Sequence, residues 1–250
     1  MLPIIIANWK MNLNVAASAV LAKNLAKKLK RISGREVALC PSFSALYAVG
    51  EILKRSRLKL GVQDLFWENV GAYTGEESPK FLRQLGCCYA IVGHSERRQN
   101  FKETDGQVRQ KIKSALANDL TPILCVGETF SERQEGRTDS IIMNQVIQAL
   151  AGVDLIPSEH LVIAYEPVWV IGSGQAIEPS EAENAFKIIR QSLIDLWPLT
   201  IVKNNVRIIY GGSIDATNVK DFTTLDYFAG FLVGGASLDE NEFVKIIESC

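Results

Sequence analysis

Short apolar runs rich in Val and Ile alternate along the chain with longer stretches in which apolar residues recur at helical spacing. This alternation is typical of repeated β-α units built around a parallel sheet. The apolar runs predict strands over Ile4 to Ala7, Val37 to Leu39, Lys59 to Val62, Tyr89 to Val92, Pro122 to Val126, Leu161 to Tyr165, Val206 to Tyr210 and Tyr227 to Val233.

Two of the longer stretches have the clearest helical pattern. Apolar residues form one stripe between Val15 and Lys30, and a second stripe runs from Ser180 to Leu196. Asn14 precedes the first stretch and Gly34 follows it, which predicts an N-cap and a helix stop.

Repeated units of this kind, in a chain of 250 residues with 47% hydrophobic content, predict an α/β fold with one (β/α)8 barrel domain over residues 1–250. An open doubly wound sheet is the alternative. That fold more naturally carries a glycine fingerprint after its first strand, where this chain has Asn8, Trp9 and Lys10. The pattern therefore favours the barrel.

Charge and cysteine content indicate the cellular compartment of the protein more clearly than its binding partners. The formal net charge is −1, which gives no field to attract nucleic acid or an anionic membrane. The opening residues lack the basic flank of a secretory signal, no apolar run is long enough to cross a membrane, and we expect a cytoplasmic protein. The odd cysteine count lacks metal-ligand spacing, so we interpret as reduced, mostly buried thiols Cys40, Cys87, Cys88, Cys125 and Cys250.

Polar or glycine residues follow several predicted strands at their carboxyl ends. In a closed parallel barrel these ends meet at one mouth, so residues far apart in the sequence converge there. A lone Lys or His at such a position is usually a solvated or structural residue, and only their joint placement indicates a site. The residues are Asn8, Lys10, His94, Glu96, Glu166, Gly211, Gly212, Ser213, Gly234 and Gly235.

Glu166 has the most informative surroundings. It directly follows a buried strand and precedes Pro167, which cannot donate to a sheet, and Gly172 and Gly174, which permit unusual backbone angles. A carboxylate at the end of a strand and at the start of a hinged loop is typical of a general base under a lid. We expect the lid to run from Pro167 to Gly174.

Five segments occur in order along the chain: NWKMN at 8–12, VGHSERR at 92–98, AYEPVW at 164–169, YGGS at 210–213 and LVGGASL at 232–238. In identity, order and spacing they closely resemble the triosephosphate isomerase family. The resemblance runs from the first predicted strand to the last helix. The residue chemistry alone reaches only a small phosphorylated carbonyl compound.

The resemblance implies interconversion of dihydroxyacetone phosphate and glyceraldehyde 3-phosphate through an enediolate, without a metal or an organic cofactor. Glu166 is then the base, and His94 polarises the carbonyl oxygen. The helix that begins after His94 disfavours its charged form, an argument for which this family is a standard worked example. Lys10 supplies fixed positive charge, and Asn8 orients Lys10 and donates a further hydrogen bond.

By the same resemblance, the substrate phosphate is bound by backbone amides of Gly172, Ser213, Gly234 and Gly235. Paired glycines that merely turn the chain are the alternative for any single pair. Two further residues stay open. Glu96 is either close to the chemistry or a partner in a helix cap. Cys125 is a supporting thiol near the site or, as its neighbours favour, plain core.

The segment from Gln63 to Glu76 is long for a barrel connection and contains apolar side chains such as Phe66 and Tyr73. The resemblance implies a homodimer in which this segment enters a second subunit. Thr74 then reaches the neighbour's Asn8 and Lys10 region, and Glu76 faces the arginine matched by Arg97.

Four positions depart from the common pattern of the family: Gln175 where Lys is frequent, Glu178 where a Thr cap is usual, Ala229 where Asp is common and Glu77 where an aliphatic residue is usual. They bear on the lid, stability and the dimer. Two other functions stay as alternatives, another phosphate-binding barrel enzyme and a non-catalytic binding protein on the same fold. The first would share the glycine-rich loops but needs a different acid/base set, and the second would tend to lose Glu166.

Overall fold

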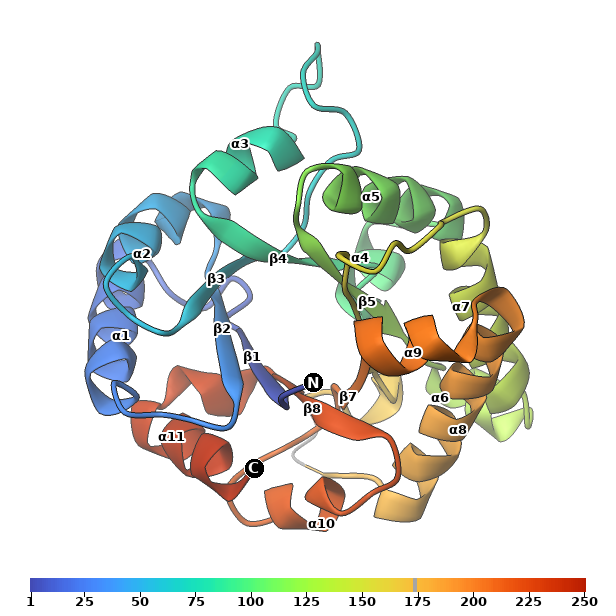
Figure 1. Ribbon diagram of the computed structural model, residues 1–250. Coiled ribbons are helices and arrows are strands. Elements are labelled where there is room, and N and C mark those ends of the chain that lie inside the picture. Colours follow the sequence, from blue (N-terminus) through green and yellow to red (C-terminus); the bar gives the residue numbers. More distant parts are fainter. Residues whose placement is uncertain (173–174) are drawn as a thin grey trace.

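The computed structural model describes residues 1–172 and 175–250. In this part of the chain, parallel strands close into a barrel in sequence order, and the last strand pairs with the first (Figure 1). The closure confirms the barrel and excludes the open doubly wound sheet. The strands are β1 (Ile4–Asn8), β2 (Glu36–Cys40), β3 (Lys59–Val62), β4 (Cys87–Val92), β5 (Thr121–Val126), β6 (Leu161–Tyr165), β7 (Val206–Tyr210) and β8 (Phe228–Val233).

The predicted strands match these in order, and β3, β6 and β7 agree at both ends. Each of the other strands differs from its predicted range by one or two residues at one end, and β2 differs at both ends. Glu36 and Thr121, for example, pair through their backbones although their side chains are not apolar. Apolar patterning therefore located the strands but did not fix their ends.

Helices surround the barrel on its outside (Figure 1). None of those in the described residues is long and apolar enough to cross a membrane. The α-helices are α1 (Val15–Lys28), α2 (Leu46–Leu53), α3 (Pro79–Gln84), α4 (Ser95–Asn100), α5 (Asp105–Ala117), α6 (Phe130–Gln134), α7 (Thr138–Leu150), α8 (Pro179–Leu196), α9 (Leu199–Asn205), α10 (Val219–Thr223) and α11 (Glu240–Ser249), and the short 3₁₀ helices are η1 (Phe43–Ala45), η2 (Val168–Val170) and η3 (Gly235–Leu238).

The two expectations for the ends of α1 have different outcomes. Asn14 is the N-cap, and its side chain accepts a hydrogen bond of 2.9 Å from the backbone N–H of Ala17. The expectation that Gly34 stops the helix is wrong. The helix ends at Lys28, and the chain then turns through a hydrogen bond from the Ile32 N–H to the Leu29 carbonyl. Gly34 lies beyond this turn, with a φ of 76°.

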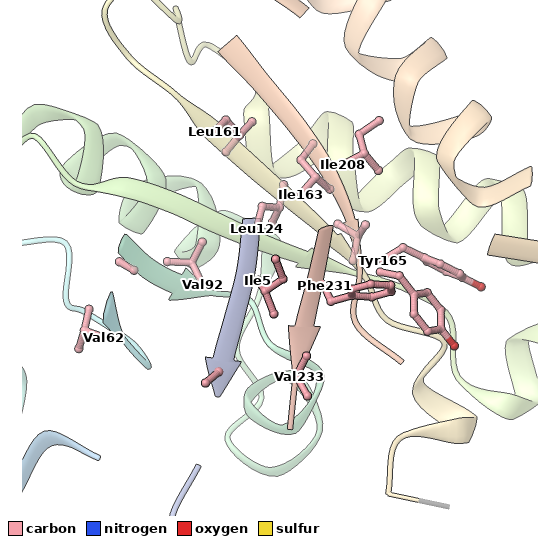
Figure 2. Close-up of a cluster of buried hydrophobic side chains, with 14 of the residues drawn as sticks. Ile5, Val62, Val92, Leu124, Leu161, Ile163, Tyr165, Ile208, Phe231 and Val233 are labelled. Carbon is pink, nitrogen blue, oxygen red and sulfur yellow. The ribbon is translucent and has the colours of Figure 1, made fainter. Parts of the chain in front are cut away.

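Side chains on each strand alternate between two buried layers. Ile4 and Ile6 belong to a cluster made almost entirely from strand residues, which fills the barrel interior. Ile5 belongs to the larger cluster, which also contains helix residues such as Leu25 and Ile189. Figure 2 shows part of this outer layer, with side chains from several strands gathered in one cluster. Because both faces of every strand are buried, the strands are apolar almost throughout.

Closure between β8 and β1 depends on a glycine. Gly230 has a φ of 137° and pairs with Ile4, and a Cβ atom at this position would lie 1.8 Å from the Ile4 carbonyl oxygen. No side chain fits in that space without displacing the β1 backbone. The barrel therefore closes through a contact that only glycine permits.

We expect Gly230→Ala to lower the free energy of unfolding by at least about 2 kcal/mol, because it adds a clash to an unfavourable backbone angle. Gly34→Ala is the matched control. Gly34 also has a positive φ, but a Cβ atom there would have no neighbour within 4 Å. The control should cost roughly 1 kcal/mol. Urea denaturation of both variants checks this, and equal losses would contradict the role given to the β8–β1 contact.

Candidate active site

A cavity of about 340 Å³ opens at the carboxyl ends of the strands. Side chains from different elements meet in it: Asn8 from β1, Lys10 from the loop that follows, His94 from the loop before α4, and Glu166 from the end of β6. The glycine-rich segments after β7 and β8 form another part of its wall. The residues of these segments and of the predicted lid in its lining are Ile171, Gly172, Gly211, Gly212, Ser213, Ile214, Asp215, Gly234, Gly235 and Ala236.

Glu166 is buried, with 1% of its surface exposed. Its Oε2 accepts a hydrogen bond of 2.9 Å from the backbone N–H of Ser95. Its Oε1 has no hydrogen-bond partner among the described residues and lies 3.0 Å from His94 Nε2, without the alignment of a hydrogen bond. One oxygen is thus fixed by the backbone, and the other is left free to accept a proton.

Two glycines hold the backbone and side chain of Glu166 in place. A Cβ atom at Gly127 would lie 1.8 Å from the Glu166 carbonyl oxygen, and one at Gly211 would lie 3.0 Å from Glu166 Cγ. The Glu166 N–H donates to the Val126 carbonyl over 2.7 Å. The segment after β5 therefore approaches the Glu166 backbone more closely than a side chain at Gly127 would allow, and the segment after β7 packs tightly against the Glu166 side chain.

His94 is the N-cap residue of α4. Its Nδ1 accepts a hydrogen bond of 3.2 Å from the backbone N–H of Glu96. A nitrogen that accepts a hydrogen bond carries no proton, so this contact assigns the proton of the neutral ring to Nε2. The start of the helix thus favours the tautomer of the neutral ring that carries its proton on Nε2, at the wall of the cavity.

Lys10 has a φ of 50°, which is unfavourable for a residue with a side chain. Asn8 Oδ1 accepts from its backbone N–H over 3.2 Å, and Gln63 Nε2 donates to its carbonyl over 2.9 Å. The Lys10 ammonium lies 2.6 Å from Glu96 Oε1. Polar contacts at three points therefore hold this strained residue. The third of these contacts is an ion pair between Lys10 and the Glu96 carboxylate.

Glu128 anchors the first turn of the segment predicted as a lid. This carboxylate is fully buried and accepts from Trp169 Nε1 over 3.0 Å and from the Tyr165 hydroxyl over 3.2 Å. Burial raises the pKa of Glu128 above its ordinary value, and the hydrogen bonds from Trp169 and Tyr165 oppose this rise. The guanidinium of Arg133 lies 4.4 Å from the Trp169 ring centre. The lid segment thus begins from a firmly held turn.

The remainder of the predicted lid is only partly within the described residues. Gly172 lines the cavity and has a φ of 76°, as a hinge glycine permits. Ser173 and Gly174 lie outside the described residues. Glu178 occupies the N-cap of α8 without a hydrogen bond from its side chain to the helix.

The glycine-rich segment after β8 leads into η3. A Cβ atom at Gly234 would lie 3.5 Å from Lys10 Cε, so this backbone runs directly beside the lysine side chain. The Ser237 hydroxyl donates to the Gly234 carbonyl over 2.6 Å, which fixes the turn. In the described parts of the chain, no group of three His, Cys, Asp or Glu side chains converges as metal ligands would.

A largely buried cluster of ion pairs lies next to the loop that carries His94. Lys111 lies 2.6 Å from Asp64 Oδ1 and also contacts Glu103, while Arg97 Nη2 lies 2.9 Å from Asp64 Oδ2. Glu103 Oε2 accepts from the backbone N–H of Gly93, which directly precedes His94, over 3.1 Å. The cluster therefore joins the loop after β3 to the loop that carries His94.

Comparison with known proteins agrees with this geometry. The family model described as Triosephosphate isomerase matches residues 3–250. Curated triosephosphate isomerases from Dictyoglomus turgidum, Endomicrobium trichonymphae and Carboxydothermus hydrogenoformans are 43%, 44% and 44% identical over 246 residues. Each alignment covers 98% of both chains. The chain belongs to the triosephosphate isomerase family.

Membership in the triosephosphate isomerase family confirms the resemblance and decides against the two alternatives, another phosphate-binding barrel enzyme and a non-catalytic binding protein. The roles of individual site residues stay predictions, although the structure brings the predicted residues to one cavity. Sequence reasoning missed three contributors, namely Gln63, Ser95 and Glu128. Glu128 follows β5 closely, as Glu166 follows β6. The same reasoning from polar residues at the carboxyl ends of strands was therefore sufficient to find it.

Cys125 lies in the barrel interior and is fully buried. Burial, and then the neighbouring Glu166, raise the pKa of its thiol. Burial raises the pKa of Cys40 in the same way. Both thiols are therefore inert core groups in the folded protein.

We expect iodoacetamide at pH 8 to modify Cys88 first, because this thiol is only half-buried. Cys250 is also half-buried, but burial raises the pKa of its thiol to about 11, so it should react more slowly. Cys40 and Cys125 should react only after unfolding. Peptide mass spectrometry before and after denaturation checks this order. Early modification of Cys125 in the folded protein would contradict its assignment to the core.

Proposed function

We propose that this chain interconverts dihydroxyacetone phosphate and glyceraldehyde 3-phosphate, with Glu166 as the base that moves a proton between adjacent carbons. The observation that carries the proposal is the free Oε1 of a buried carboxylate, 3.0 Å from His94 Nε2 at the wall of one cavity. A base and an electrophile at this separation both reach one small substrate.

In the proposed reaction, Glu166 Oε1 takes a proton from the carbon next to the carbonyl. Electrons move onto the carbonyl oxygen, where the Nε2–H of His94 and the Lys10 ammonium stabilise the enediolate. The same carboxyl group then returns the proton to the neighbouring carbon, while the hydroxyl oxygen on the first carbon loses its proton and the former carbonyl oxygen gains one. Asn8 and Glu96 hold Lys10 in position through the contacts of 3.2 Å and 2.6 Å described above.

We assign the phosphate of the substrate to the backbone amides of Gly172, Ser213, Gly234 and Gly235. All four residues line the cavity, and Gly234 lies beside Lys10, whose positive charge also attracts a dianion. In this proposal the lid closes over the bound substrate from the turn that Glu128 anchors. Closure excludes water and strengthens the carboxylate as a base toward carbon.

The purified chain should isomerise glyceraldehyde 3-phosphate, and Glu166→Gln should lower kcat by about a hundredfold or more. His94→Gln should lower kcat with a smaller effect on phosphate affinity. Lys10→Met should damage both, because its positive charge is proposed to act on the enediolate and on the phosphate. Steady-state kinetics with each variant checks this order. Equal rates for the chain and Glu166→Gln would remove Glu166 as the base.

We also propose that the chain forms a homodimer through the segment from Gln63 to Glu76. This segment projects from the barrel between β3 and α3 (Figure 1). It is internally ordered, since the Phe66 N–H donates to the Glu77 carbonyl over 2.9 Å and the ring centres of Phe66 and Tyr73 lie 4.6 Å apart. An ordered projection of this kind suits insertion into a partner.

Large apolar side chains are exposed on this segment and on other loops and helices. Met11, next to Lys10, is 95% exposed. Isolated exposed apolar residues are common, but so many suggest a surface that a second copy covers. Val70 and Tyr73 are the exposed examples on the segment itself, and further examples among the described residues include Phe43, Tyr47, Phe81, Leu85 and Phe101.

Thr74→Arg should produce monomers with low activity, because Thr74 is proposed to support the neighbour's Lys10. Thr200→Arg, at an exposed position in α9, is the control that should leave both properties unchanged. Analytical ultracentrifugation and kinetics over a dilution series measure the two properties. A Thr74→Arg monomer with full activity would refute the proposed role of the dimer.

We further propose that residues 1–250 act as a single domain in the cytoplasm. The large hydrophobic cluster contains residues from β1 to α11, which supports one cooperative unit. The free cysteines suit a reducing compartment.

A further inference from the structure

A second cavity, of about 240 Å³, lies at the opposite end of the barrel from the candidate active site. Its wall is formed by α8, α9 and the first residues of β7 and β8. Figure 1 shows α9 and the start of the chain close to β7 and β8. Since the candidate active site lies at the carboxyl ends of the strands, this cavity is separate from it.

Positive side chains line this cavity without a carboxylate among the described lining residues. They are Arg190 from α8, Lys203 from α9 and Arg207 from β7. Arg207 is 7% exposed and lies 2.9 Å from Glu36, which compensates its charge, but its Nε has no hydrogen-bond partner in the described structure. Arg190 and Lys203 form no ion pair within the described residues. The cavity therefore has an excess of positive charge.

The remaining wall is mainly apolar. Leu193, Val202 and Ile208 are buried residues that face it. A small inorganic ion would leave this apolar surface uncovered, and a neutral apolar molecule would leave the cations without a partner. The lining matches a molecule with one acidic group and an apolar body.

Tyr227 at the edge of the cavity supports a binding role. It has a φ of 65°, which is rare for an aromatic residue, and such strain concentrates at ligand sites. The Arg190 guanidinium lies 4.6 Å from the centre of its ring. A guanidinium that contacts an aromatic ring in this way keeps N–H groups that can donate to an acidic group.

We propose that this cavity binds a small amphiphilic anion, with its acidic group on Arg190 and Lys203 and its apolar body against Leu193, Val202 and Ile208. Ala229 also lines the cavity and contributes no charge to it. A carboxylate introduced at this position would share the cavity with Arg190.

Isothermal titration calorimetry with the full chain tests this, with octanoate as the probe and octanamide as its neutral match. Octanoate should bind with a Kd below about 1 mM. Octanamide should bind at least about tenfold more weakly, because it makes no charge-assisted hydrogen bond. Absence of octanoate binding, or equal affinities for the two probes, would overturn the proposal.

Variants of residues in the lining test whether octanoate binds in this cavity. Ala229→Asp and Arg190→Ala should each weaken octanoate binding by about tenfold or more, because they remove the uncompensated charge. Ala229→Asn is the match without charge, and Lys187→Ala removes a cation of α8 that is absent from the lining; both should bind octanoate normally. Thermal melting confirms that each variant folds. Equal octanoate affinity in Ala229→Asp and Ala229→Asn would overturn the assignment to this cavity.

Discussion

The close approach of three chain segments around Glu166 is the constraint on which the rest of the site depends. Gly127 and Gly211 leave no space for a side chain beside it, and the Ser95 amide holds one of its oxygens. The carboxylate therefore stays buried at a fixed place, with its other oxygen free. A buried carboxylate is costly unless its surroundings supply hydrogen bonds, and within the described part of the chain the backbone supplies one, from Ser95. One hydrogen bond therefore fixes the position of the Glu166 carboxylate, and its second oxygen remains available for a substrate proton.

Much of the fold was predictable because central parallel strands are apolar on both faces, and that pattern is visible without any knowledge of tertiary structure. The strand-end rule then placed Asn8, Lys10, His94 and Glu166 at one mouth. Helix ends were less predictable. Gly34 has the backbone angle of a helix stop, but α1 ends earlier through a turn at Leu29 that carries no sequence signal.

The supporting contacts could not be predicted in the same way. Gln63, which follows β3, donates a hydrogen bond to the Lys10 carbonyl after β1. The contact from Ser95 to Glu166 uses a backbone amide that any residue except proline would provide. Such contacts depend on the register between neighbouring strands, and single-sequence patterns do not encode it. Gly127 shows the same limit, because only the tertiary structure reveals that its missing side chain makes room for Glu166.

The buried cluster of Asp64, Arg97, Glu103 and Lys111 has a consequence for how this protein can vary. Its two acids and two bases balance, and Asp64, Glu103 and Lys111 are buried, so replacing a single member upsets the charge balance of a largely buried cluster. Replacements that remove one acid together with one base would keep the charge balance. Natural substitutions at these four positions should therefore occur in coordinated pairs, because a single substitution would destabilise the protein.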